Sequence, residues 1–110
     1  KMRMTGTTGM SYNAWEVWAA EVKFEDSPQV KSRPVLILED KVAYAICIKM
    51  TGTPPRRGEY ALKDWGLVGL KKPTTVRLEK VLNLYPRDLK YKIGDLSPLD
   101  IANIQSMLII

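Results

Sequence analysis

The chain has 110 residues and a mass of 12.5 kDa, with 45% apolar and 26% charged residues. This length suits one compact domain, which buries roughly two-thirds of its unfolded surface without disulfides. No run approaches the ~18 consecutive apolar residues of a membrane span, and no apolar signal core follows the first residues. We therefore expect a small intracellular domain with no membrane partner.

Lysine and arginine outnumber aspartate and glutamate by 17 to 12, which gives a net charge of +5. Ten of these cations, but only six of the acids, follow residue 50. A cationic excess favours polyanionic partners through Coulomb attraction and counterion release. At this modest charge, a surface that merely keeps the protein in solution is the more frequent explanation.

The residues that are missing narrow the possible chemistry. The chain has no histidine, and its one cysteine, Cys47, lies in the apolar run 42–48, where we expect a buried, unreactive thiol. Zinc-type ligand spacings, a Walker loop and a Ser-His-Asp set are absent. The adjacent acids at 25–26 and 39–40 point to opposite faces of an extended chain, so we expect no metal site and no cofactor.

The chain divides into a loose N-terminal arm, residues 1–14, and a single domain over residues 15–110. Enrichment in β-branched and aromatic residues between turn residues predicts strands over residues 15–24, 35–38, 42–50, 60–62, 74–84 and 91–96. The short turn at 39–41 makes the strands on either side of it an antiparallel hairpin. Residues 25–32 form a polar loop, and residues 63–70 and 86–89 each favour an irregular or helical turn.

One helix is predicted at the end of the chain, over residues 97–108. Ser97, Pro98 and Asp100 have the order of an N-cap, a first-turn proline and a first-turn acid. Apolar residues then follow at helical spacing: Leu99, Ile101, Ala102, Ile104, Met107 and Leu108. Many short strands with one closing helix indicate a mainly β (α+β) fold, a small barrel or half-barrel with a helix packed on it.

Four residues stand out as candidates for chemistry. Arg33 precedes Pro34 at a strand start, where a guanidinium can bind a phosphate, although an exposed surface arginine is more common. Thr51 follows a strand and can donate a hydrogen bond to an anion, although turn threonines are more common. Arg77 and Glu79 leave one face of a strand, either as a surface ion pair or as a cation beside a proton acceptor.

The order and spacing of these segments resemble the MazF/PemK-like ribonuclease toxins of bacterial toxin–antitoxin pairs, over residues 15–108. The segments that carry the likeness are Glu16-Val17-Trp18, Arg33-Pro34-Val35-Leu36-Ile37-Leu38, Ala45 to Thr51, Gly69 to Lys80, and Ile93 to Ser97 with the helix. The resemblance implies an SH3-like barrel of the CcdB/MazF/PemK kind. It also implies a cytoplasmic homodimer that cuts single-stranded RNA without a metal ion.

The resemblance also implies roles for the four candidates. Arg33 matches the arginine that contacts the scissile phosphate, Thr51 matches an active-site threonine, and Arg77 with Glu79 match the Arg-x-acid pair of some members. The 2′-OH of RNA would attack the adjacent phosphate and leave a 2′,3′-cyclic phosphate and a 5′-OH. Glu79 is the first candidate for the proton acceptor and Asp26 the second. The loop at 25–32 departs from the Gly-His-Glu or Ser-Glu-Gln types of many relatives.

The expected RNA contacts are Asp26, Gln29, Lys31, Arg56, Arg57, Lys71 and Lys72. Four aromatic residues can stack on bases, namely Trp15, Trp18, Tyr60 and Trp65, but we favour core or interface packing for Trp15 and Trp18. The resemblance also implies a partner, an antitoxin with a disordered acidic segment. Two other functions stay open: a non-catalytic barrel that binds nucleic acid or peptide, and a toxin of the same fold that poisons a topoisomerase.

Overall fold

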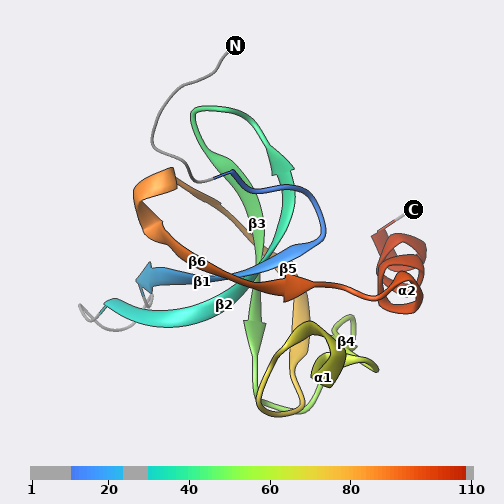
Figure 1. Cartoon of the computed structure of the whole chain (residues 1–110). Helices are drawn as coiled ribbons and strands as arrows, with labels where there is room; N and C mark the ends of the chain where they lie inside the picture. Colours follow the sequence, from blue (N-terminus) through green and yellow to red (C-terminus); the bar gives the residue numbers. More distant parts are fainter. Residues whose placement is uncertain (1–10, 24–29, 109–110) are drawn as a thin grey trace.

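In the part of the chain that the structure describes, six antiparallel strands form one sheet, in the order β4-β5-β3-β2-β1-β6 (Figure 1). A computed structural model describes residues 11–23 and 30–108. The elements are β1 (Glu16–Lys23), β2 (Val30–Asp40), β3 (Ala45–Thr51), β4 (Tyr60–Ala61), α1 (Trp65–Val68), β5 (Thr75–Leu84), the 3-10 turn η1 (Pro86–Asp88), β6 (Leu89–Asp95) and α2 (Pro98–Leu108). The predicted fold class, mainly β with a C-terminal helix, is confirmed.

The predicted β2–β3 hairpin is confirmed, but its boundaries differ from the prediction. β2 already begins at Val30, so the strand takes in the end of the predicted loop, and β3 begins only at Ala45. Val42 lies in the turn with a φ of 73°. Asp40 Oδ1 accepts a hydrogen bond from Val42 N at 2.8 Å, and this side-chain turn overrides the strand preference of valine.

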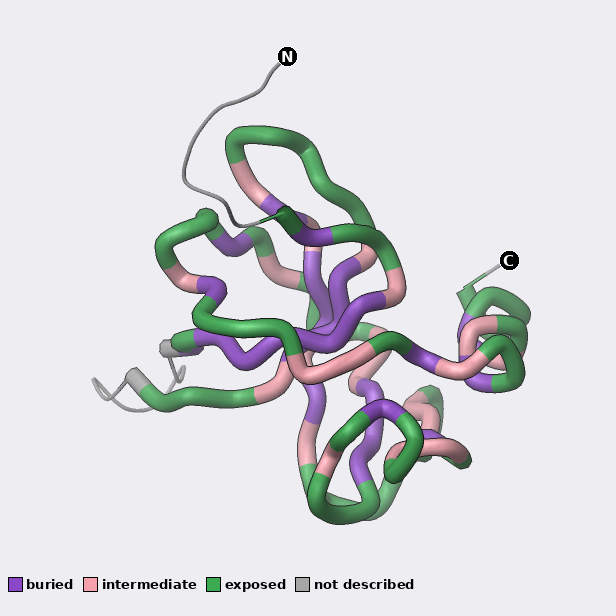
Figure 2. Tube along the Cα trace, viewed as in Figure 1, coloured by how far each residue is buried: buried purple, intermediate pink, exposed green. Residues whose placement is uncertain are grey.

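The curled sheet buries both of its faces. Trp18, Val35 and Cys47 belong to one apolar cluster, whereas Leu36 and Ile48 belong to a second cluster on the opposite face. This alternation follows the two-residue period of a strand. The buried parts of β1, β2 and β3 meet where the strands cross (Figure 2). Cys47 is fully buried, as predicted, and burial raises the pKa of its thiol to about 12.

The sheet does not close into a full barrel. In the described part of the chain, β4 and β6 are its two edges and do not pair with each other. α1 packs on β6 instead, at Gly94, where an added Cβ would lie 1.8 Å from the carbonyl oxygen of Val68. Only a glycine allows this close approach, which brings α1 against the β6 edge of the sheet.

The C-terminal helix is tied to the β4–α1 segment by a buried carboxylate. Ser97 caps α2 as predicted, since its Oγ accepts a hydrogen bond from Asp100 N at 3.1 Å. Asp100 is fully buried and accepts hydrogen bonds from the hydroxyl of Tyr60 and from the backbone N–H groups of Lys63 and Asp64. The docking of α2 therefore fixes the position of β4.

Only part of the expected helix stripe faces the core. Ile104 is buried and Ile101 packs against the second cluster. Leu99, Met107 and Leu108 are 48%, 41% and 38% exposed, because α2 lies at the end of the sheet and not across it (Figure 1).

Part of the predicted N-terminal arm can be followed. Residues 1–10 lie outside the described ranges, but Tyr12 is buried and packs edge-on against Trp18, with ring centroids 6.2 Å apart. Among the described helices, none has the length and apolar character needed to cross a bilayer.

Candidate active site

The candidate site is built around the point where β2 and β3 separate. The two strands pair as far as Val35 and Lys49. Beyond that pair β2 continues with β1, so that Arg33 lies opposite Ala20, and β3 continues with β5 (Figure 1). Arg33 and Thr51 each lie two residues from the Val35–Lys49 pair, and by the strand period they leave the same face of the sheet.

Pro34 is compatible with this position because it lies just beyond the β2–β3 pairing. Its partner is Ala19 on β1, and β3 no longer runs beside it. A proline has no N–H to donate, so it is tolerated where one side of a strand has no neighbour. The proline also restricts Arg33 to an extended backbone. The Arg33-Pro34 sequence thus lies where β2 stops pairing with β3 and continues beside β1 alone.

Thr51 and Arg77 line the same small hollow, of about 40 Å³, together with Thr53, Arg56 and Glu59. Thr51 pairs with Thr75 on β5, and Arg77 follows two residues later on the same face. The Oγ1 of Thr51 accepts a hydrogen bond from Thr53 N at 3.2 Å, which orients the hydroxyl. We call this group of five residues the Thr51 hollow.

Within the Thr51 hollow, Arg77 is held by Glu59. Its Nε donates to Glu59 Oε2 at 3.0 Å, and Glu59 Oε1 accepts a hydrogen bond from Arg56 N at 3.0 Å. The Arg56 hydrogen bond first, and then the Arg77 guanidinium, lower the pKa of Glu59. Within the described residues Arg77 makes no other hydrogen bond, so its terminal nitrogens can bind an anion.

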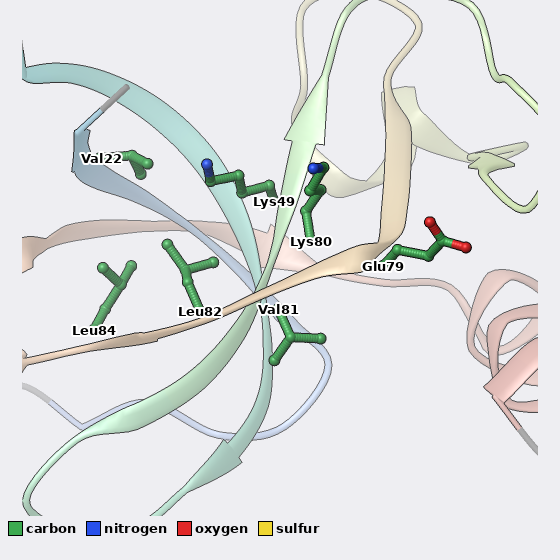
Figure 3. Close-up of a pocket in the computed structure, with 7 residues that line it drawn as sticks. All are labelled: Val22, Lys49, Glu79, Lys80, Val81, Leu82 and Leu84. Carbon is green, nitrogen blue, oxygen red and sulfur yellow. The ribbon is translucent and has the colours of Figure 1, made fainter. Parts of the chain in front are cut away.

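Glu79 therefore does not form the surface pair with Arg77 that the sequence allowed. It lies in the part of β5 that bulges against β3, between the pairs Met50–Val76 and Ile48–Val81. An added Cβ on Gly58 would lie 3.8 Å from Glu79 Oε1, so this carboxylate is beside the loop that carries Glu59. Figure 3 shows Glu79 pointing away from Leu82 and Lys49.

Two residues of this region do not stand out in the sequence. Glu59 lies in a loop rich in glycine and proline, where its place close to two arginines and before a short strand is a usable signal. Lys49 lies within the predicted strand 42–50, where the surrounding apolar residues draw no attention to it. It lies opposite Val35 at the separation point and lines a hollow with Lys80 and Glu79 (Figure 3). Arg33, Lys49 and Arg77 thus place positive charge on three adjacent strands, β2, β3 and β5.

The predicted RNA contacts divide into three groups. Arg56 lies in the Thr51 hollow, and Lys71 and Lys72 line a larger hollow that Arg33 also lines. Lys31 and Arg57 are exposed but line neither of these hollows. Asp26 and Gln29 lie outside the described residues.

The aromatic residues belong mainly to the core. Trp18 is 4% exposed, and its Nε1 donates to Glu16 Oε1 at 2.8 Å. Trp15, Tyr60 and Trp65 are half-buried and pack against the second cluster. The core packing favoured for Trp15 and Trp18 is confirmed.

Comparisons with known proteins identify the family and the fold of the chain. A family model described as PemK-like, MazF-like toxin of type II toxin–antitoxin system matches residues 13–110. The chain is similar to an endoribonuclease of a mycobacterial species solved with its cognate antitoxin, at 15% identity over 89% of this chain and 91% of that one, with a TM-score of 0.69. A second mycobacterial endoribonuclease has 16% identity over 92% and 91% of the two chains and a TM-score of 0.70. The Mycobacterium tuberculosis toxin MazF-mt6 has 22% identity over 84% and 91%, with a TM-score of 0.68. The TM-scores show a shared fold, and at these identities the likeness shows the fold alone. No curated protein matches the sequence.

Proposed function

Because the chain belongs to the PemK-like, MazF-like toxins of type II toxin–antitoxin systems, as its sequence indicated, we propose that it is an endoribonuclease for single-stranded RNA. The observation that carries this proposal is the placement of Arg33, Thr51 and Arg77 around the point where β2 and β3 separate. Two guanidinium groups and a hydroxyl on one face of a sheet form a binding site for one phosphodiester.

The reaction needs no nucleophile from the protein. The 2′ oxygen forms a bond to phosphorus, and the bond from phosphorus to the 5′ oxygen breaks. The proton of the 2′-OH passes to a carboxylate and finally to the 5′-hydroxyl product, and the other product is a 2′,3′-cyclic phosphate. Arg33 and Arg77 stabilise the charge that develops on the phosphorane, and Thr51 donates a hydrogen bond to one of its oxygens.

Glu79 is the better candidate for the proton acceptor. Both oxygens of Glu59 already accept hydrogen bonds, and its lowered pKa makes it a weaker base. Glu79 forms no hydrogen bond or ion pair with the described residues, and its carboxylate lies beside Gly58 in the same loop. Glu59 therefore positions Arg77 while Glu79 receives the proton.

The function includes partners that the family suggests. We propose a cytoplasmic homodimer whose cognate antitoxin covers the basic face with a disordered acidic segment. The charges of Arg33, Lys49 and Arg77 support such a partner, because an acidic peptide and an RNA backbone are recognised by the same guanidinium and ammonium groups.

The proposal is tested by incubating the purified protein with a long unstructured RNA in the presence of EDTA. The wild type should cut the RNA, and Arg33→Ala should cut it about 10²–10³-fold more slowly. Tight RNA binding without cleavage would contradict the proposal and favour a non-catalytic barrel. Inhibition of DNA supercoiling without RNA cleavage would instead indicate a topoisomerase poison.

A further inference from the structure

A second, larger hollow beside the candidate site lies between the β1–β2–β6 part of the sheet and the loop that joins α1 to β5. It has a volume of about 630 Å³, within the range of ligand sites, and we call it the Tyr91 hollow. Arg33, Lys72 and Tyr91 are among the residues that line it, and Ala19 and Pro34 provide small apolar walls. Since Arg33 lines it, the Tyr91 hollow adjoins the residues that would bind the scissile phosphate.

The local backbone explains why a hollow exists here. Ala19 on β1 pairs with both Pro34 and Tyr91, so a small side chain stands between the two neighbouring strands. β6 is irregular on both sides of Tyr91, because Lys90 and Ile93 have no partner on β1. Bulges of this kind redirect side chains and are frequent beside functional sites.

The charge of the hollow selects an anionic occupant. Among the residues that the structure describes, no acidic one lines it, whereas Arg33, Lys71 and Lys72 do. Lys71 and Lys72 have no ion pair or hydrogen bond from their side chains to the described residues. Lys92 also lines the hollow, but it is paired with Glu16 and Asp95 at 3.2 and 3.1 Å.

Lys72 connects the Tyr91 hollow to the catalytic face. An added Cβ on Gly52 would lie 2.9 Å from Lys72 Nζ, so the ammonium group lies against the residue that follows Thr51. A polymer bound at Thr51 therefore passes directly beside Lys72. The opposite wall offers Tyr91, an aromatic side chain that is 62% exposed.

We propose that the Tyr91 hollow is a nucleotide-binding subsite that holds one nucleotide of the single-stranded RNA next to the scissile phosphate. This inference rests on the proposed function and adds a determinant of sequence preference to it. The base stacks on Tyr91 and packs against Leu70 and Ile93, while Lys71 and Lys72 bind its phosphate.

The first test compares Tyr91→Ala and Tyr91→Phe with Tyr85→Ala. Tyr85 is a matched control because it is 50% exposed, lies outside the hollow and packs on Arg87. Binding is measured by fluorescence anisotropy with a 2′-O-methyl RNA oligonucleotide, which cannot be cleaved. Tyr91→Ala should bind about tenfold more weakly, whereas Tyr91→Phe and Tyr85→Ala should bind like the wild type.

The second test uses a pool of random-sequence RNA whose cleaved ends are sequenced. Tyr91→Ala should relax the base preference at one position next to the cleaved bond and leave the other positions unchanged.

A third test measures how RNA binding depends on salt. Lys72→Gln should reduce the slope of the logarithm of the binding constant against the logarithm of the salt concentration by about 0.7. Lys63→Gln is the control and should leave the slope unchanged, because Lys63 is exposed and lies outside the hollow.

The outcomes separate the subsite from the proposed function. If the wild type cuts RNA and Tyr91→Ala has unchanged affinity and base preference, the subsite proposal is wrong and the proposed function stands. If the wild type binds 2′-O-methyl RNA through Tyr91 but cuts no RNA, the proposed function is wrong, and the Tyr91 hollow holds a nucleotide of bound RNA without a cleaved bond beside it. If the variants lose inhibition by the cognate antitoxin but behave normally towards RNA, the hollow binds the antitoxin and the subsite proposal is overturned. Absence of RNA binding by the wild type overturns both.

Discussion

Arg77 on β5 and Glu59 in the loop before β4 are joined by a hydrogen bond of 3.0 Å between Nε and Oε2. The contact links residues eighteen positions apart, and the two side chains are only 32% and 13% exposed. It holds one edge of the guanidinium and leaves the terminal nitrogens for a ligand on the side of Thr51. The loop from residue 52 to 59 thereby becomes part of the candidate site.

Replacing the two glutamates should separate positioning from proton transfer. Glu79→Gln should lower kcat by about 10²–10⁴-fold and remove the acidic limb of the pH–rate profile, because it removes the proton acceptor. Glu59→Gln should lower kcat by up to about 10²-fold through misplacement of Arg77, with the acidic limb retained. Single-turnover rates across a pH series measure both effects. Loss of the acidic limb in Glu59→Gln alone would reverse the two assignments.

The Glu59–Arg77 pair also predicts how stability depends on pH. The folded protein holds the pKa of Glu59 below its ordinary value of 4.5, so the pair stabilises the fold fully above that value. This stabilisation disappears as the pH falls through the lowered pKa of the folded state. The difference in melting temperature between the wild type and Glu59→Gln should therefore be largest near neutral pH and shrink in acid. A difference that grows in acid would show that the carboxylate is not stabilised by folding.

Asp100 should matter to the fold far more than an exposed acid. The carboxylate of Asp100 accepts hydrogen bonds from the hydroxyl of Tyr60 and from two backbone N–H groups. Asp100→Asn replaces one of the accepting oxygens with an NH2 group that faces these donors, which should lower the free energy of unfolding by about 2–4 kcal/mol. Asp95→Asn is the control, because its pair with Lys92 is exposed and should contribute only about 0–1 kcal/mol. Urea unfolding measures both variants. Equal stabilities would contradict the anchoring role of Asp100.

The two glycines that flank the α1–β6 contact should respond differently to alanine. Gly94→Ala would drive its Cβ into the carbonyl of Val68 and should destabilise the protein by about 3 kcal/mol or more. Gly66 lies in α1 with nothing within 4 Å of an added Cβ, so Gly66→Ala should be neutral or stabilise by up to about 1 kcal/mol. The denaturant concentrations at which the two variants are half unfolded measure both effects. An unchanged stability of Gly94→Ala would contradict the close packing of α1 against β6.

Local signals were sufficient for much of the fold. The Ser97 cap, the β2–β3 hairpin and the buried Cys47 follow from turn residues and from apolar spacing within a few positions. The prediction that Val42 lies in a strand is wrong, because the hydrogen bond to the Asp40 side chain stabilises a turn at Val42 and outweighs the strand preference of valine. The exposure of Leu99 could not be foreseen, since it depends on where α2 ends up relative to the sheet.

The candidate site was harder to predict than the fold. Arg33, Thr51 and Arg77 could be chosen individually, but their grouping depends on where β2 and β3 stop pairing, which is set by the whole sheet. The pairing of Arg77 with Glu59 instead of Glu79 depends on the path of a loop. Such long-range contacts leave no periodic pattern in a single sequence.

The central claim is that this face of the sheet activates the 2′-OH of RNA at one phosphodiester. The most direct measurement uses an RNA with a mapped cleavage site and a matched RNA that carries a single 2′-deoxy nucleotide on the 5′ side of that bond. Cleavage at the substituted bond should disappear, cleavage elsewhere should continue, and the natural RNA should end in a 2′,3′-cyclic phosphate. Undiminished cleavage at the deoxy-substituted bond would contradict the account.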